Sequence, residues 1–134
     1  MTLYVDASAL LKLYFDESDS LRAEEILVAD PEWVTARQTS IEVRRNLVRE
    51  LQGPALRAAR RQFERDWQAL AVVELTHDVC EAAADIAEVT GARTLDALHL
   101  GAARMAGGGL LPFVTFDLRQ GQAARALGWV VLGS

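Results

Sequence analysis

The sequence predicts an α/β fold with three layers (α/β/α), in which helices cover both faces of a five-stranded, mostly parallel sheet. Short apolar runs alternate with helix-like segments along the chain, and these runs are continuously apolar rather than alternating with polar residues. Strands joined by helices form right-handed crossovers and pair in parallel, and continuously apolar strands are typical of a sheet covered on both faces. The expected strands are residues 2–5, 33–35, 72–75, 113–115 and 129–132.

The segments between these strands carry helix signals. Ser20, Ser40 and Thr94 precede apolar residues at helical spacing and are typical N-cap residues. Pro54 suits the first position of a helix, and Gly91 suits the end of one. The expected helices are residues 9–14, 20–29, 41–51, 54–70, 79–90, 95–105 and 118–127.

A chain of 134 residues, 51% hydrophobic and 25% charged, fits one domain spanning residues 1–134. Its single cysteine, Cys80, excludes an internal disulfide framework and a cysteine-rich zinc site, and we expect it to be a small core residue. The longest uncharged run, residues 105–116, is too short to span a membrane, and the N-terminus does not resemble a signal peptide. We therefore expect a cytoplasmic protein.

The charge is unevenly distributed. The net charge of −5 argues against a general nucleic-acid binder, yet eight arginines stand against three acids between residues 36 and 65. This arginine-rich stretch fits two functions equally well. It can guide RNA, because guanidinium groups make bidentate contacts with phosphate, or it can be a solvated helix face paired with Glu50, Glu64 and Asp66.

Two acids are expected at the carboxyl ends of strands, where open α/β sheets bind ligands. Asp6 directly follows residues 3–5, and Asp117 lies two residues after residues 113–115. Asp is also a favoured N-cap at a strand-to-helix turn. Capping is the more frequent role for either residue alone, and one carboxylate can serve as both cap and ligand.

Two further acids stand in the expected first turns of helices. Glu42 follows Ser40, and Asp96 is the lone acid in the apolar segment 94–103. Either can simply offset the helix dipole. If all four acids converge, each pair of carboxylates about 4 Å apart repels by roughly 4 kcal/mol at an effective dielectric of 20. Such a cluster takes up protons or binds hard divalent cations such as Mg²⁺ or Mn²⁺, which activate water and neutralise phosphate charge.

Four segments in order resemble the acidic motifs of the PIN-domain family, with the closest likeness to VapC-type ribonuclease toxins of bacterial toxin–antitoxin pairs. They are Tyr-Val-Asp-Ala-Ser-Ala-Leu at 4–10, Ser-Ile-Glu-Val at 40–43, Leu-Asp-Ala-Leu-His-Leu at 95–100 and Phe-Val-Thr-Phe-Asp at 113–117. The resemblance implies a PIN-like α/β fold and a Mg²⁺- or Mn²⁺-dependent endoribonuclease that cleaves RNA. It also implies a homodimer and inhibition by a cognate antitoxin protein.

By this resemblance, the catalytic and metal-binding residues are Asp6, Glu42, Asp96 and Asp117, supported by the hydroxyls of Ser8 and Thr115. Some relatives carry a further acid where this chain has Arg119, which leaves open whether one metal ion or two are bound. The candidate RNA contacts are Arg44, Arg45 and Arg119.

Several signals leave alternatives open. His99 lies one helical turn after Asp96 and can be a base, a metal ligand or, most simply, a structural histidine. His77 is expected at the entry to a helix. Trp33, Trp67 and Trp129 are expected to anchor the core, and the apolar stripe over residues 10–15 is expected to pack on the sheet and to offer any surplus to a partner.

Two other function classes compete with the nuclease. A phosphohydrolase or phospho-receiver also places an Asp after its first strand, but phosphatases of that kind carry a second Asp where this chain has Ser8. Both also use a late Lys, and the only lysine here is Lys12. A non-catalytic PIN-like interaction module is the third reading, and the presence of all four acids disfavours it.

Overall fold

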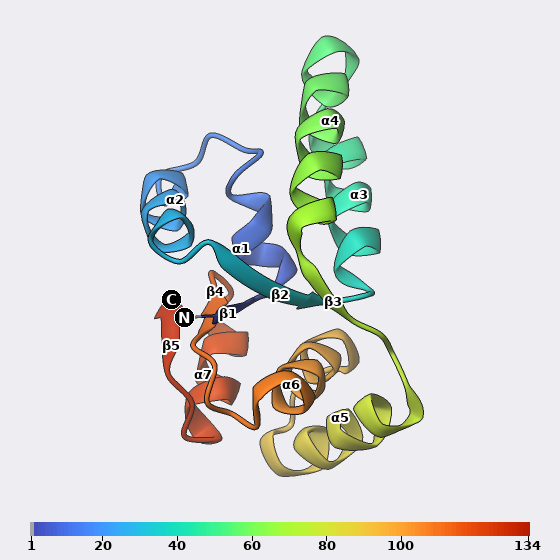
Figure 1. Cartoon of the computed structure of the whole chain (residues 1–134), viewed down its shortest axis with the longest axis vertical. Coiled ribbons are helices and arrows are strands. Elements are labelled where there is room, and N and C mark those ends of the chain that lie inside the picture. The colour runs from blue at the N-terminus through green and yellow to red at the C-terminus, as the bar shows by residue number, and fades with distance from the viewer. Residues whose placement is uncertain (1) are drawn as a thin grey trace.

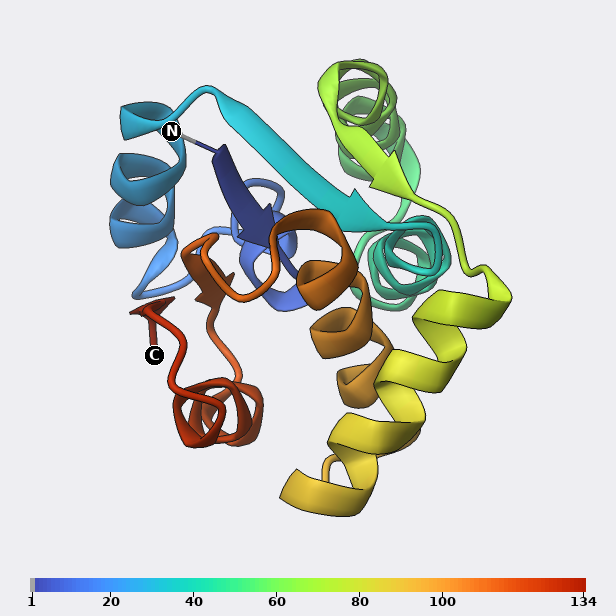
Figure 2. The ribbon, with the colours of Figure 1, turned by 60° about the horizontal axis from the view of Figure 1, so that its bottom comes forward.

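The structure, a computed structural model, describes residues 2–134 and confirms the predicted α/β fold, with helices on both faces of one five-stranded sheet (Figure 1 and Figure 2). The strands are β1 (Thr2–Val5), β2 (Glu32–Ala36), β3 (Ala71–Val73), β4 (Phe113–Thr115) and β5 (Val131–Gly133). The helices are α1 (Ala7–Leu11), α2 (Ser20–Ala29), α3 (Thr39–Glu50), α4 (Gly53–Ala69), α5 (His77–Thr90), α6 (Thr94–Gly107) and α7 (Leu118–Ala126).

The strand order is β3-β2-β1-β4-β5, and every pair of neighbours is parallel. β1 lies at the centre: Tyr4 pairs with Val34 of β2 on one side and with Phe113 of β4 on the other. Because all strands run in the same direction, their carboxyl ends lie along one edge of the sheet. The residues that follow β1, β2 and β4 are therefore brought close together.

The side chains of β1 alternate between two apolar cores. Leu3 and Val5 belong to a cluster that contains residues of α1, α2, α3 and α4. Tyr4 belongs to the other cluster, with residues of α5, α6 and α7. One central strand thus fixes both helical layers. Trp33 and Trp67 pack against the first cluster and Trp129 against the second, as expected of core anchors.

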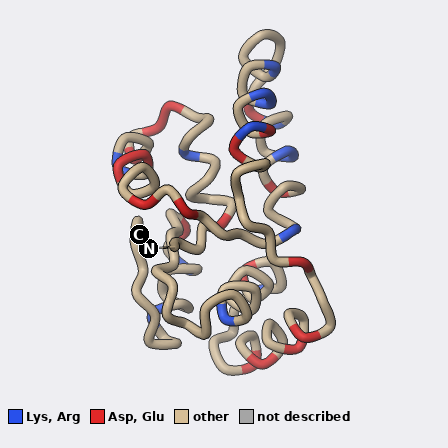
Figure 3. Tube along the Cα trace, viewed as in Figure 1, with Lys and Arg blue, Asp and Glu red and all other residues tan. Residues whose placement is uncertain are grey.

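Helices α3 and α4 lie side by side and project beyond the sheet as a long arm (Figure 1). The turn between them needs a glycine, because Gly53 has a φ of 61°. Pro54 then occupies the start of α4, as predicted. The arm carries seven of the 14 basic residues (Figure 3).

The predicted N-caps are displaced by one or two positions. Ser20 and Thr94 are the first residues of their helices, and Ser40 is the second residue of α3. The N-caps are Asp19, Arg93 and Gln38, and none of them caps through its side chain. The serine hydroxyls instead bond to carbonyls of the preceding loop, from Ser20 to Phe15 and from Ser40 to Arg37. Competing bonds of this kind are not visible in the sequence.

Cys80 is exposed on α5, so the prediction that it is a core residue was wrong. α5 buries Val79, Ala83 and Ile86, which recur at helical spacing and face α6, and Cys80 therefore points away from the core. The predicted strands 72–75 and 129–132 are also displaced, because their ladders end at Val73 and Gly133. Within residues 2–134, no helix combines the length and apolarity needed to cross a membrane.

Candidate functional site

The four predicted acids, Asp6, Glu42, Asp96 and Asp117, lie around the carboxyl edge of β1 and β4, which we call the acidic edge. Asp6 directly follows β1, and Asp117 follows β4 by two residues. Glu42 and Asp96 stand in the first turns of α3 and α6. The two strands are neighbours in the sheet, about 4.8 Å apart.

Asp6 and Asp117 both cap helices, as one of the sequence interpretations held. The Oδ1 atom of Asp6 accepts a hydrogen bond from the backbone N–H of Ala9 (3.1 Å) at the start of α1. The Oδ1 atom of Asp117 accepts one from Gln120 (3.1 Å) at the start of α7. Asp6 is buried, with 4% of its surface exposed, whereas Asp117 is exposed. Capping fixes the direction of both carboxylates without excluding a second role.

Two hydroxyls join the ends of β1 and β4. Ser8 donates a short hydrogen bond of 2.6 Å to Asp6 and lies 3.2 Å from the hydroxyl of Thr115. The Ser8 hydroxyl accepts from the N–H of Phe116, and that of Thr115 accepts from the N–H of Asp117. These bonds hold the Asp6 carboxylate against the loop that carries Asp117.

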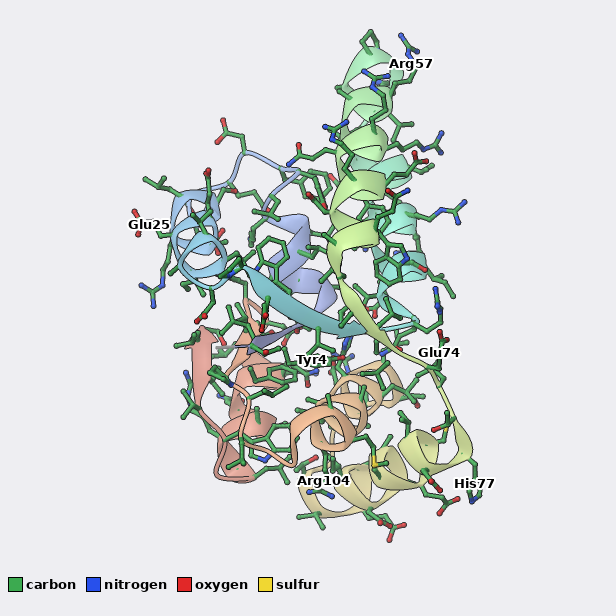
Figure 4. All side chains as sticks on the ribbon, viewed as in Figure 1. Tyr4, Glu25, Arg57, Glu74, His77 and Arg104 are labelled. Atoms are coloured by element: carbon green, nitrogen blue, oxygen red, sulfur yellow. The ribbon has the colours of Figure 1, made fainter. Side chains whose placement is uncertain are left out.

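His99 connects Glu42 to the core. Its Nε2 atom lies 2.8 Å from Oε1 of Glu42, and its Nδ1 atom lies 2.9 Å from the hydroxyl of Tyr4. The imidazole is buried, and Tyr4 occupies the middle of the molecule, where the helical layers meet β1 (Figure 4). Tyr4 was not among the site residues predicted from the sequence. A hydroxyl-bearing side chain in a central, otherwise apolar strand is nevertheless a usable signal, because such a buried group requires a hydrogen-bond partner.

The acids influence one another electrostatically. Burial raises the pKa of Asp6, and the nearby His99 and the bonds from Ser8, Thr115 and Ala9 only partly oppose this effect. The pKa of Asp96 is raised by burial first, and then by the charges of Asp117 and Glu42. Asp96 therefore lies within the electrostatic reach of two other members of the group.

As placed, however, the side chains do not form a closed cage for an ion. In the part of the chain that the structure describes, no three His, Cys, Asp or Glu side chains lie close enough to hold one metal. Glu42 faces His99 instead. To hold an ion, the four acidic side chains would have to move closer together. Their chemistry nevertheless fits a hard divalent cation, because all four are carboxylates. The raised pKa values of Asp6 and Asp96 would be lowered by the positive charge of such an ion.

The candidate RNA contacts lie on different surfaces. Arg44 and Arg45 are exposed on α3, and Arg44 lines a hollow between α3 and α4. Arg119 is exposed on α7 and lines another hollow that also contains Asp96. Among residues 2–134, the only arginine that forms an ion pair is Arg37, with Glu74. The pairing with Glu50, Glu64 and Asp66, one of the two interpretations of the arginine-rich stretch, is therefore absent from the described residues.

Lys12 does not serve the acidic edge. Its amine contacts Glu17 at 3.1 Å and Asp19 at 2.8 Å, in the loop that joins α1 to α2. A receiver or phosphatase needs its lysine free to contact the phosphorylated carboxylate. The partners of Lys12 therefore weaken that alternative further.

A family model described as the PIN domain matches residues 3–126. The crystal structure of the toxin VapC20 from Mycobacterium tuberculosis, titled as sarcin-ricin loop cleaving, has a TM-score of 0.72 at 22% identity, covering 96% of each chain. A toxin–antitoxin complex from Klebsiella pneumoniae has a TM-score of 0.69 at 16% identity, covering 86% of each chain. FitAcB from Neisseria gonorrhoeae has a TM-score of 0.72 at 16% identity, covering 98% of this chain and 96% of that one. At these identities the likeness shows a shared fold, and a search of curated proteins found no match.

Proposed function

This chain belongs to the PIN-domain family, and from that premise we propose that it is a Mg²⁺- or Mn²⁺-dependent endoribonuclease that hydrolyses RNA phosphodiester bonds. One observation carries the proposal. Four carboxylates, Asp6, Glu42, Asp96 and Asp117, surround one edge of the sheet, and burial raises the pKa values of Asp6 and Asp96, with repulsion from neighbouring acids adding to the effect at Asp96. Ionising Asp6 and Asp96 at neutral pH therefore destabilises the folded protein. Carboxylates with pKa values raised in this way are typical of functional sites.

In this proposal the four carboxylates hold the metal, which when bound neutralises phosphate charge and activates water for attack on phosphorus. Hydrolysis adds the water oxygen to phosphorus and breaks a bond from phosphorus to a ribose oxygen, which receives a proton. Asp6 has the most rigid carboxylate, because Ser8 and the backbone of Ala9 both donate to it. His99 orients Glu42 through their 2.8 Å contact. The candidate RNA contacts Arg44, Arg45 and Arg119 attract the substrate.

We also propose that the protein is the toxin of a toxin–antitoxin pair and acts in the cytoplasm, where its RNA substrate lies. The surface that fits an antitoxin is a hollow between α1 and α2. Leu13, Tyr14 and Phe15 line it together with Leu21 and Val28 of α2, which are 68% and 70% exposed. An amphipathic antitoxin helix would cover this apolar surface. The apolar stripe predicted from the sequence thus packs partly on the core and partly lines this hollow.

The proposed homodimer has support from exposed aliphatic side chains beside the acids. Ile41, Leu95 and Leu118 are the sequence neighbours of Glu42, Asp96 and Asp117, and they are 68%, 50% and 64% exposed. A second copy that covers them would remove this apolar surface from water. Molar mass from light scattering distinguishes the dimer from a monomer.

The decisive experiment is cleavage of a structured RNA by purified protein without antitoxin, in Mg²⁺, Mn²⁺ or EDTA. We expect cleavage with either ion and none in EDTA. Asp6→Asn and Asp96→Asn should each abolish it, while Asp85→Asn, an exposed acid on α5, should not. Metal-independent cleavage, or full activity of either site variant, would contradict the proposal, and hydrolysis of small phosphate esters instead of RNA would favour the phosphohydrolase.

The antitoxin assignment has a separate test. The product of the neighbouring reading frame should bind the protein and block RNA cleavage. Leu21→Glu together with Val28→Glu should abolish this inhibition and leave cleavage unchanged, because both residues lie on α2, which carries none of the four acids. Inhibition that survives both changes would place the antitoxin elsewhere.

A further inference from the structure

The hollow that contains Arg119 and Asp96 adjoins the acidic edge and lies between the turn from α5 to α6 and helix α7. Its volume is about 360 Å³, and its lining includes Arg93, Asp96, Arg119 and Gln122. Asp96 belongs both to this hollow, which we call the α5–α7 hollow, and to the four acids. A molecule bound in the α5–α7 hollow would therefore contact the same carboxylate as a molecule bound at the acidic edge.

The α5–α7 hollow carries positive charge that is not paired. Arg93 and Arg119 are both exposed, and within residues 2–134 neither has a carboxylate at ion-pair distance. The positive charge of Arg93 nevertheless reaches the carboxylate of Asp96. Two guanidinium groups without ion pairs, lining one hollow, are suited to bidentate contact with a phosphate.

Small residues leave the α5–α7 hollow open. Gly91 ends α5 in the left-handed conformation, with a φ of 75°, and Ala92, Ala123 and Ala126 add only methyl groups to the lining. Gln122 offers the one side-chain amide, which can both donate and accept hydrogen bonds. The volume falls at the small end of the range of ligand sites, about 300 to 1,000 Å³.

We propose that the α5–α7 hollow binds the phosphate and ribose of the nucleotide next to the cleaved bond of the RNA substrate. This inference rests on the proposed ribonuclease function and adds a subsite to it. Arg93 and Arg119 hold the phosphate, and Gln122 faces the ribose or the base edge. Because Asp96 is shared, a strand with one phosphate at the acids continues into the α5–α7 hollow.

The test measures RNA binding separately from cleavage. In an Asp117→Asn background with Mg²⁺ present, a fluorescently labelled short single-stranded RNA is titrated at several salt concentrations, and its anisotropy is recorded. Arg93→Ala with Arg119→Ala should weaken binding at least tenfold. It should also lower the slope of log affinity against log salt by about 1.4, or about 0.7 for each lost phosphate contact. Arg93→Lys with Arg119→Lys should keep the slope.

The matched control is Arg22→Ala with Arg104→Ala, which removes the same charge outside the α5–α7 hollow (Arg104 is labelled in Figure 4). We expect it to change affinity less than threefold. Equal effects of the two double variants, or an unchanged salt slope in the Arg93 and Arg119 variant, would overturn the subsite. Cleavage of RNA by the unmodified chain is assayed in parallel. If this chain does not cleave RNA, the ribonuclease proposal is refuted. If it cleaves RNA but the Arg93 and Arg119 variant binds RNA as tightly as its parent does, only the subsite is refuted.

Discussion

The Nε2 atom of His99 lies 2.8 Å from Oε1 of Glu42, so a buried imidazole links a candidate metal ligand to the protein core. Its other nitrogen, Nδ1, contacts the hydroxyl of Tyr4 at 2.9 Å. A nitrogen that faces a carboxylate carries a proton, so in the neutral ring Nδ1 accepts a hydrogen bond from Tyr4. The orientation of Glu42 on α3 is thus fixed by one residue of α6 and one of β1.

Tyr4→Phe tests this link. Tyr4 is fully buried, and the change leaves Nδ1 of His99 without its partner in the interior. Leaving a buried polar atom unsatisfied costs about 1–3 kcal/mol, so we expect that loss in the free energy of unfolding by urea. Tyr14→Phe removes a half-buried hydroxyl bond, to Asp66, and should cost less. A Tyr4→Phe loss no larger than that of Tyr14→Phe would show that the contact does not hold His99.

Glu42→Gln should cost more stability at acidic than at alkaline pH. Burial lowers the pKa of His99, but the bond to Glu42 and the charges of Asp6 and Asp96 more than offset this effect, so the pKa is raised from 6.5. The stabilisation by this pair is therefore complete below pH 6.5 and is lost as the pH rises through the folded-state value.

In the Glu42→Gln variant the side-chain amide oxygen still accepts a hydrogen bond, so we expect a loss of roughly 1–2 kcal/mol just below pH 6.5 and a smaller one at alkaline pH. Urea unfolding at both pH values measures the difference, with Glu50→Gln on the same helix as the control. RNA cleavage should be lost while the protein stays folded. A loss that does not depend on pH would mean that His99 is uncharged in the folded protein.

Asp96→Asn should stabilise the metal-free protein. The pKa of Asp96 is raised from 3.8 by burial and by the charges of Asp117 and Glu42, so its ionisation opposes folding. The contribution of Asp96 to the stability of the wild type is therefore most favourable below pH 3.8 and falls as the pH rises through its folded-state pKa. Asn cannot ionise, so the variant does not lose this stability as the pH rises. We expect a gain on the order of 0.5 kcal/mol at neutral pH, allowing for screening by solvent, and none in acid. Asp85→Asn is the control, and a neutral-pH loss in Asp96→Asn would assign Asp96 a structural role.

Apolar periodicity predicted most of the fold, because the chain has a consistent pattern at each element. The run 113–115 became β4 with the predicted bounds, and Gly91 ended α5 as expected. Helix starts were less accurate, since Ser20 and Ser40 form competing bonds to loop carbonyls. Cys80 was misplaced because composition indicates a residue's preference for burial but not which side of a helix it faces.

The candidate site was less accessible to sequence reasoning than the fold. Strand ends located Asp6 and Asp117, because a parallel sheet brings those ends together. The contact between Tyr4 and His99 joins residues 95 positions apart, and only the packing of α6 on the sheet brings them together. Arg93 was also overlooked, because its position beside Asp96 depends on the turn between α5 and α6.

Gly101→Ala should destabilise the protein although alanine favours helices. A Cβ at Gly101 would lie 2.8 Å from the backbone N of Ala83 and 2.9 Å from the carbonyl oxygen of Val79, so α5 and α6 would have to separate. We expect a loss of about 1–3 kcal/mol by thermal or urea unfolding. Gly121→Ala is the matched control, because there the Cβ meets the end of the Ser134 side chain, which can move. Equal stability of the two variants would mean that the helices separate without cost.

Divalent ions should stabilise the protein more as their concentration rises above Kd. An ion that binds only the folded state adds RT ln(1 + [L]/Kd), about 2.7 kcal/mol at a hundredfold excess over Kd. We therefore expect the melting temperature to rise with Mg²⁺ or Mn²⁺ but not with K⁺ at equal ionic strength. Asp6→Asn should lose most of this rise, because it removes the carboxylate that Ser8 and Ala9 hold in place. Asp85→Asn should keep the rise, and an equal rise in both variants would mean that the ion binds away from the four acids.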